Sequence, residues 1–255
     1  MWIYLVAPFI GLGAGILGSM FGLGGGFLIV PLLNIAGVDI RIAIGTSASA
    51  IFFNMLSSTI AYSRYRYVMY RAGFLLSTAS IVTAYFGAQL TEVIDPDLLK
   101  TVFGFVLILV GLRMIITSSS SASEKRMLEW SLRNYVVLVL GGCLAGFMAG
   151  FLGVGGGIVN VPLLTSLGFS MHYAVATSSM AITITSITSA LTHHTLGNVD
   201  LGLLIFLVPS LVIGAQIGAS IAKKTKSVTL KRGFAIVMWF IALRMILKGL
   251  GFNVP

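Results

Sequence analysis

Apolar runs of about 20 residues follow one another along almost the whole chain, and this feature limits the possible folds more than any other. A helix of about that length is needed to cross the hydrocarbon core of a bilayer. With 57% hydrophobic and 9% charged residues, the chain carries more apolar side chains than one water-soluble core can bury. The sequence therefore predicts an all-α, polytopic integral membrane protein whose outer surface is covered by the lipid bilayer.

The basic residues are placed as in a membrane protein. The formal net charge is +9, but the lysines and arginines lie in short loops between apolar runs, as in the cytoplasmic loops of membrane proteins. This placement argues against nucleic acid as a partner. Cys143 is the one cysteine and lies in an apolar run, so it forms no intrachain disulfide and its expected role is packing.

Two glycine-rich segments of nearly the same sequence reveal an internal repeat. The first reads "FGLGGGFLIVPLL" (residues 21–33) and the second "LGVGGGIVNVPLL" (residues 152–164), an offset of 131 positions. One unit is therefore duplicated. Further matches are Thr46 with Thr177, Ser47 with Ser178, Asn54 with Thr185 as a polar pair, and, after a deletion of four residues, the "GAQ" of residues 87–89 with that of residues 214–216.

A polar, serine-rich stretch marks the boundary between the two units. We expect an N-terminal transmembrane repeat at 1–117, a cytoplasmic linker at 118–133 and a C-terminal transmembrane repeat at 134–255. Each repeat holds a pair of short segments broken by glycines, followed by three fuller spans. The expected segments are 3–21, 24–36, 39–62, 70–90 and 97–117, then 134–152, 155–167, 172–193, 201–222 and 228–250.

Equivalent loops of the two repeats carry opposite charge. The loop with Arg64 and Arg66 corresponds to "HHTLGNVD" (residues 193–200), which has no Lys or Arg, whereas acidic "TEVIDPD" (residues 91–97) corresponds to basic "AKKTKSVTLKR" (residues 222–232). The positive-inside rule then places equivalent loops on opposite sides of the membrane. The sequence predicts an inverted-topology repeat with both termini outside.

Three consecutive glycines in each repeat predict a broken helix near the bilayer midplane. Inverted-repeat transporters bind their substrates at such breaks, where freed N-terminal amides face anionic groups. Glycines permit this backbone and leave its amides unobstructed. We therefore expect alanine at Gly25 or Gly156 to weaken anion binding without loss of folded protein. The alternative is close helix packing, which we expect for Gly15 and Gly146. Pro31 and Pro162, five residues beyond the glycines, are expected to mark kinks or helix ends.

The span after each glycine break is rich in neutral hydroxyl groups, and no carboxylate falls in the middle of any span. A cation transporter is expected to place a carboxylate in its membrane path, so neutral donors favour an anion. Hydrogen bonding to their own helix is the alternative role of such Ser and Thr residues. The candidate substrate-binding residues are Gly24, Gly25, Gly26, Thr46, Ser47, Asn54, Gln89, Gly155, Gly156, Gly157, Thr177, Ser178, Thr185 and Gln216.

The doubled glycine motif, each copy followed by a Thr-Ser-rich span, and the "GAQ" in both halves resemble the TauE/SafE family of sulfite and organosulfonate exporters. The resemblance covers nearly the whole chain. It implies a permease of the cytoplasmic membrane that moves small sulfur-containing anions, such as sulfite or sulfoacetate, outward. The motif positions that carry over are Gly22, Gly24, Gly25, Gly26, Pro31, Gly153, Gly155, Gly156, Gly157 and Pro162.

Export of a small anion is the function that these features favour. An anion leaving a cell gains about 2.3 kcal/mol per unit charge at 100 mV, so the membrane potential favours export without an evident coupling-ion site. The alternatives are ion-coupled uptake of a related anion such as sulfate or thiosulfate, and an anion channel. An enzyme is disfavoured, since no span holds a catalytic or metal-ligand set; no cofactor or metal is expected, and a homodimer is possible.

His193 departs from the symmetry of the repeat. The second half has His193 and His194 where the first has Tyr62 and Ser63. His193 ends a polar span near the expected outer face, where it is either a solvated helix end or a sensor of mild acid.

Cysteines introduced at Arg66 and Lys226, in a protein whose Cys143 is replaced by alanine, test the inverted topology. We expect both on the cytoplasmic side, because both loops are basic although they are not equivalent in the repeat. An impermeant thiol reagent should then leave both unlabelled in intact cells and label both in inverted vesicles. Labelling of either cysteine from outside would contradict the arrangement.

Overall fold

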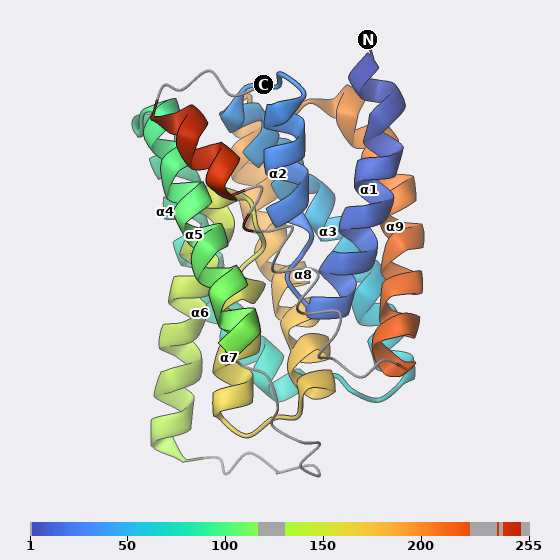
Figure 1. Cartoon of the computed structure of the whole chain (residues 1–255). Helices are drawn as coiled ribbons and strands as arrows, with labels where there is room; N and C mark the ends of the chain where they lie inside the picture. Colours follow the sequence, from blue (N-terminus) through green and yellow to red (C-terminus); the bar gives the residue numbers. More distant parts are fainter. Residues whose placement is uncertain (1, 117–130, 225–238, 240–241, 251–255) are drawn as a thin grey trace.

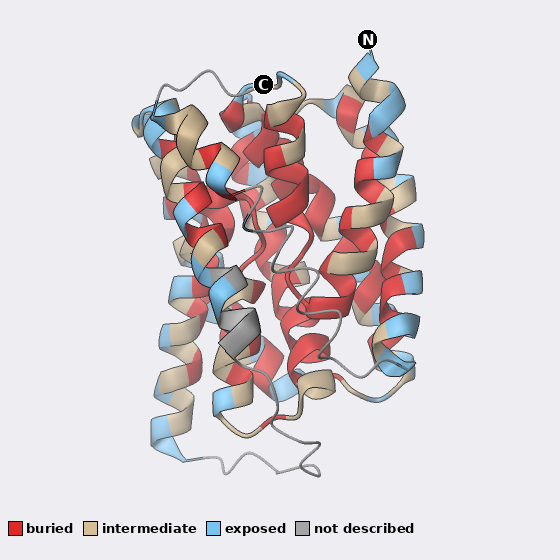
Figure 2. Cartoon of the chain, in the orientation of Figure 1, coloured by how far each residue is buried: buried red, intermediate tan, exposed pale blue. Residues whose placement is uncertain are grey.

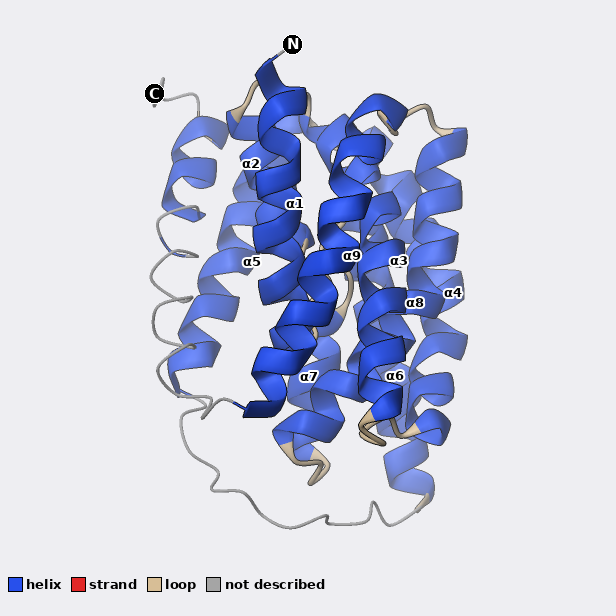
Figure 3. Cartoon of the chain, turned by 90° about the vertical axis from the view of Figure 1, so that its right-hand side faces the viewer, coloured by secondary structure: helices blue, strands red, loops and turns tan. Residues whose placement is uncertain are grey.

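The computed structural model describes residues 2–116, 131–224, 239 and 242–250. Within these ranges the chain is helical with short connections, as Figure 3 shows. Linker residues 118–130, most of the expected last span and Lys226 lie outside the described residues. The helices are α1 (Trp2–Phe21), α2 (Gly26–Ile35), α3 (Ile40–Arg64), α4 (Tyr70–Val93), α5 (Pro96–Ile116), α6 (Leu132–Leu152), α7 (Gly157–Ser166), α8 (Met171–Thr195) and α9 (Leu201–Lys224), and residues 242–249 are also helical.

The predicted all-α membrane architecture is confirmed. Six of the described helices, α1, α3, α4, α6, α8 and α9, are long and apolar enough to cross a membrane, and α2 and α7 are short apolar helices. Of the two roles expected for the prolines, the helix end is wrong. Pro31 and Pro162 lie inside the short helices, because α2 continues to Ile35 and α7 to Ser166, and the kink stays a prediction.

Two central helices, α3 and α8, pack against each other and form the middle of the bundle (Figure 1). In both α3 and α8, 72% of the most apolar stretch is buried inside the bundle. The buried share of the same stretch is 44% in α1, 39% in α4, 44% in α6 and 33% in α9. Figure 2 shows the same contrast between the buried middle and the exposed sides. The outer helices carry exposed apolar side chains such as Phe9 and Ile205, which suit contact with lipid.

Each outer helix pair joins the two halves of the chain. α1 of the first half packs along α9 of the second, and α6 of the second packs along α4 of the first. Exchange of the two halves therefore maps this pairing onto itself. In Figure 1, α1 runs downward from the N-terminal end, whereas its equivalent α6 runs upward. These directions are those that inverted halves require; the orientation in a bilayer stays a prediction.

Glycines outside the triplets allow the close packing of these pairs. A Cβ atom on Gly15 of α1 would lie 2.6 Å from the carbonyl oxygen of Leu211 in α9, and one on Gly146 of α6 would overlap the carbonyl oxygen of Ser80 in α4. The positions are equivalent in the repeat, since Leu211 and Ser80 also differ by 131 residues. The packing role expected for Gly15 and Gly146 is confirmed.

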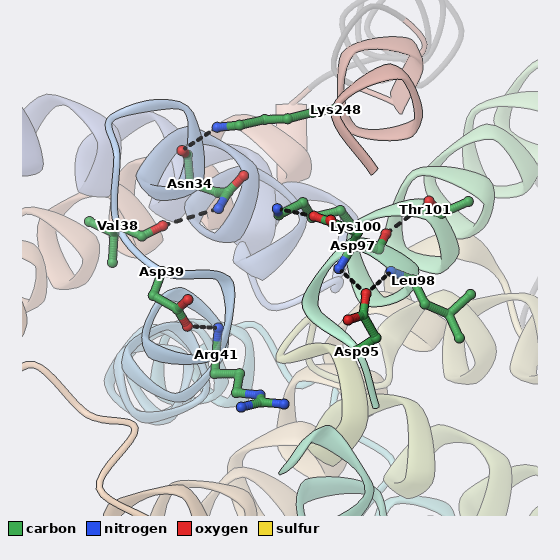
Figure 4. A network of polar contacts seen from close by, with 10 residues as sticks. All are labelled: Asn34, Val38, Asp39, Arg41, Asp95, Asp97, Leu98, Lys100, Thr101 and Lys248. Carbon is green, nitrogen blue, oxygen red and sulfur yellow. Dashed lines mark hydrogen bonds and ion pairs between the residues drawn. The ribbon is translucent and has the colours of Figure 1, made fainter. Parts of the chain in front are cut away.

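The two ends of the bundle differ in charge. We call one the acidic end, where aspartates begin helices: the side chains of Asp39, Asp95 and Asp200 accept hydrogen bonds from the first amides of α3, α5 and α9. Figure 4 shows part of this end, where Lys248 also donates to the carbonyl oxygen of Asn34 at the end of α2. The opposite, basic end carries Arg64, Arg66, Arg71, Arg133, Lys223 and Lys224.

Candidate functional site at the crossing of the glycine breaks

Both glycine triplets interrupt a helix, as the sequence predicts. α1 ends at Phe21 and α2 begins at Gly26, while α6 ends at Leu152 and α7 begins at Gly157. The residues that precede α2 and α7 have left-handed backbones, with φ of 96° at Gly25 and 49° at Gly156. A side chain strains this conformation, so glycine is the residue that can start a short helix here.

The two breaks cross each other in the middle of the bundle. A Cβ atom on Gly26 would overlap the carbonyl oxygen of Gly153, and one on Gly157 would overlap that of Gly22. Between these contacts, Gly24 faces the backbone of Val154. The backbones of the two halves therefore touch directly, and no side chain fits between them.

Each break is fastened by a serine from the central helix of the other half. Ser47 on α3 donates to the carbonyl oxygen of Gly153 at 2.9 Å, and Ser178 on α8 donates to that of Gly22 at 2.8 Å. All four residues are buried, and the two bonds are equivalent in the repeat. Ser47 and Ser178, both predicted as site residues, are thus placed at the crossing.

Asn54 makes a third contact with the break, and here the halves differ. Its Nδ2 donates to the carbonyl oxygen of Gly24 at 2.7 Å, whereas the equivalent Thr185 donates within its own helix to Ala181 at 2.9 Å. Asn54 is fully buried, and its Oδ1 has no hydrogen-bond partner among the described residues. The first break therefore retains one buried acceptor that a bound group can use.

Side chains also cover the carbonyl groups at the ends of α1 and α6. The Tyr62 hydroxyl donates to the carbonyl oxygen of Ser19 at 3.0 Å, and His193 Nε2 lies 2.8 Å from that of Gly150. Thr91 donates to Phe151 at 3.0 Å. The negative ends of both helices are thus satisfied by donors.

The starts of α2 and α7 supply the opposite polarity at the same place. The first amides of a helix have no acceptor inside it and carry the positive end of its dipole. Gly157 N donates to Gly155 O in a tight turn. With the neighbouring carbonyl groups occupied, the crossing presents two positive helix ends, which is a setting for an anion.

No Asp, Glu, Lys or Arg is buried among the described residues. The buried polar side chains there are Ser, Thr and Asn, together with Tyr62 and His193, which are both at 0% exposure. A solvated helix end, one of the two roles expected for His193, is therefore wrong. The electrostatics of the interior depend on backbone dipoles and neutral donors.

Thr46 and Thr177, both predicted as site residues, form hydrogen bonds away from the crossing. Thr46 Oγ1 accepts from the amide of Asp200 at 2.9 Å, just before α9, and Thr177 Oγ1 accepts from that of Met69 at 3.0 Å, just before α4. Met69 and Asp200 are also 131 residues apart, so these bonds follow the repeat. The two threonines hold the starts of outer helices.

The expected equivalence of the two "GAQ" motifs is wrong. Gly87 of α4 packs against the carbonyl oxygen of Phe147, and Gly218 of α9 packs in the same way against that of Ile16, so Gly218 and not Gly214 is its counterpart. No deletion is needed, and Gln89 and Gln216 are not equivalent. Gln216 Nε2 donates to Ser57 on α3 at 2.8 and 2.9 Å, while Gln89 is half-buried on α4.

Three buried polar residues near the breaks were not among the predicted site residues. Ser19 donates to Ala215 of α9 at 2.9 Å, and Tyr62 fastens the end of α1. Asn160 is buried on α7 with no partner for its Oδ1 among the described residues. The sequence does distinguish Asn160, because it is the one polar side chain in the apolar run "GIVNVPLL".

The bundle of membrane-length helices, with a polar crossing of broken helices inside it, defines a polytopic membrane transporter. The family described as "Sulfite exporter TauE/SafE" matches residues 7–245. The chain belongs to the TauE/SafE family. No solved structure was found to match it.

Several relatives cover nearly the whole chain. "Probable membrane transporter protein YunE" of Bacillus subtilis is 30% identical over 97% of this chain and 98% of its own length. "Probable membrane transporter protein MJ0441" of Methanocaldococcus jannaschii is 28% identical over 93% of each chain. "Probable membrane transporter protein YdhB" of Bacillus subtilis is 29% identical over 91% of this chain and 94% of its own.

The crowding around Gly25 changes what we expect of its substitution. A Cβ atom there would lie 2.8 Å from the carbonyl oxygen of Ala14, so Gly25→Ala should lose folded protein as well as anion binding. Gly37→Ala is the matched control, because Gly37 has φ of 95° against 96° at Gly25 but nothing within 4 Å of its Cβ position. Crowding should make Gly25→Ala the more destabilised by about 1–3 kcal/mol.

Thermal unfolding in detergent measures this difference. A Gly25→Ala protein no less stable than Gly37→Ala would contradict the close contact at the crossing.

Proposed function

We propose that the protein exports a small sulfur-containing oxyanion, either sulfite or an organosulfonate such as sulfoacetate, across the cytoplasmic membrane. One observation carries the proposal. At the crossing, side chains donate hydrogen bonds to the carbonyl oxygens of Gly22, Gly24 and Gly153. The N-terminal ends of α2 and α7 lie at the same place. Such a site attracts negative charge without a buried cation.

The absence of buried charge among the described residues favours a small, mobile anion. A transported ion must leave its site again, and a full counter-charge in a low-dielectric interior would hold it tightly. Helix ends and neutral donors hold it more weakly. The family description names sulfite exporters, and sulfite and sulfonates share an SO3 group whose three oxygens accept hydrogen bonds.

The amides of Gly24, Gly25, Gly26, Gly155 and Gly156 are the proposed ligands of this group, while the amide of Gly157 already donates to the carbonyl oxygen of Gly155. Asn54 on α3 contacts the first break, and its free Oδ1 suits an oxyanion that carries a proton. Thr185 is its equivalent on α8 and donates within its own helix. Ser47 and Ser178 act indirectly, because they withdraw the carbonyl groups of Gly153 and Gly22 from the anion.

The hydrogen bonds of Ser47 and Ser178 to the breaks also provide a mechanism for alternating access. α1 with α9 and α4 with α6 form two outer pairs that flank the central α3 and α8. Release of Ser47 from Gly153, or of Ser178 from Gly22, would free one break at a time and open the crossing toward one end. The membrane potential then favours exit, by about 4.6 kcal/mol for a dianion at 100 mV.

Flux measurements with purified protein in liposomes test this function. Liposomes loaded with sulfite should release it in a saturable manner, faster when the potential is negative inside, and sulfoacetate should compete. Ser47→Ala, which exposes the Gly153 carbonyl group to the site, should reduce the flux about tenfold, or about 1.4 kcal/mol in binding. Ser49→Ala is the matched control, since Ser49 bonds within its own helix to Gly45.

The alternative functions give other results. Uptake that depends on a proton or sodium gradient would favour ion-coupled import of sulfate or thiosulfate. A large current that does not saturate would favour a channel. Absence of any saturable flux of sulfite or sulfonates would contradict the proposal.

A further inference from the structure

His193 is the one histidine buried among the described residues, and its exposure is 0%. It lies near the end of α8 at the acidic end of the bundle, two residues before α8 ends at Thr195. A buried ionisable side chain inside a membrane bundle is expensive and is by default a functional candidate.

His193 makes the same helix-end contact as its counterpart Tyr62, and in addition it has a second ring nitrogen. Its counterpart Tyr62 donates through its hydroxyl to Ser19 O, and His193 Nε2 makes the equivalent contact with Gly150 O. Because a carbonyl oxygen only accepts, Nε2 carries the hydrogen in this contact. The other ring atom, Nδ1, is then an acceptor; it is buried and has no partner among the described residues. A tyrosine would fasten the helix without leaving this atom unused.

Few charged groups surround the imidazole. Glu92 at the end of α4 acts on it electrostatically, and Asn198 donates to the Glu92 carboxylate. Arg41 at the start of α3 donates to the carbonyl oxygen of Glu92. α1 and α7 carry no charged residue, and α6 presents the Gly150 carbonyl oxygen while its Arg133 lies at the basic end. α9 has its lysines at the basic end also.

We infer that Nδ1 of His193 is a proton-binding site that controls opening of the transporter at the acidic end. The inference rests on the proposed transport function. A proton passes from hydronium to the Nδ1 lone pair and leaves water, so the ring becomes a cation with two N–H donors. In the closed arrangement Nδ1–H meets no acceptor, so protonation favours a state in which α8 moves away from α6. There Nδ1–H reaches water, Glu92 or an oxygen of the anion.

The site works in one half alone. Tyr62 occupies the equivalent position toward the basic end and does not titrate near neutral pH. The bond that Tyr62 makes to α1 therefore does not respond to pH, whereas the bond that His193 makes to α6 does. If the positive-inside rule holds, the acidic end faces outward, so the external pH sets the release step.

Cysteine labelling tests the inference without any substrate. In a Cys143→Ala background, a cysteine replaces Ser189, which lies one turn before His193 and bonds to Ala149 of α6 at 3.4 Å. Labelling by an impermeant thiol reagent should be about tenfold faster at pH 5.5 than at pH 8, once corrected for the reagent's own pH dependence, because acid opens this contact. His193→Tyr, which copies the first half, should abolish the increase.

Two further variants distinguish loss of the titrating group from loss of folded structure. His193→Gln keeps a donor for Gly150 without titration and should behave as His193→Tyr, so a folding defect in one variant does not decide the result. Tyr62→Phe removes the equivalent bond of the first half and should leave the pH dependence intact. An acid response that persists in both His193 variants, or is missing in the parent, would overturn the inference.

Transport assays separate this inference from the proposed function. Efflux of isethionate, a sulfonate whose own charge is constant in this range, should change about fivefold between pH 5.5 and pH 8 in the parent and remain flat in His193→Tyr. If labelling responds to pH but no sulfonate moves, the substrate proposal fails and the proton site stands. If sulfonate moves with the same pH profile in both proteins, the proton site fails.

Discussion

A backbone inside a bilayer must satisfy its own hydrogen bonds, and the rest of this structure depends on how the two glycine breaks meet that requirement. Water is absent from the hydrocarbon core, so each unpaired amide or carbonyl group there costs several kcal/mol. At the crossing, Ser47 and Ser178 each bond to a carbonyl oxygen of the opposite half. Neither half can therefore form its break alone, and the two halves must fold around each other.

This mutual dependence explains the remaining architecture. The breaks approach closely enough to leave no space for a side chain at Gly26 or Gly157. The outer pairs hold the halves together by the same means, with backbone carbonyl groups packed onto glycines such as Gly15 and Gly146. Tight contact between small residues replaces the hydrophobic driving force that water supplies to soluble proteins.

Much of the fold follows from the sequence, and the site follows in part. Apolar runs predicted the bounds of α1 to α9 to within a few residues, and the glycine triplets located both breaks, because these signals are local. The partners of Ser47 and Ser178 lie 106 and 156 residues away, so no local pattern announces them. The identical "GAQ" sequences predicted that the two motifs are equivalent in the repeat. The packing contradicts this, because Gly218, and not Gly214, makes the contact that corresponds to that of Gly87. The crowding of Gly25 by Ala14 is likewise a property of the assembled bundle.

The central claim is that an oxyanion binds at the crossing of the two breaks. Anomalous scattering from selenite, a heavier analogue of sulfite with the same shape, locates such an anion directly in crystals of the protein. The account predicts a selenium peak whose oxygens lie about 3 Å from backbone amides of residues 24–26 or 155–156. A peak bound elsewhere in the bundle, with no contact to either break, would contradict it.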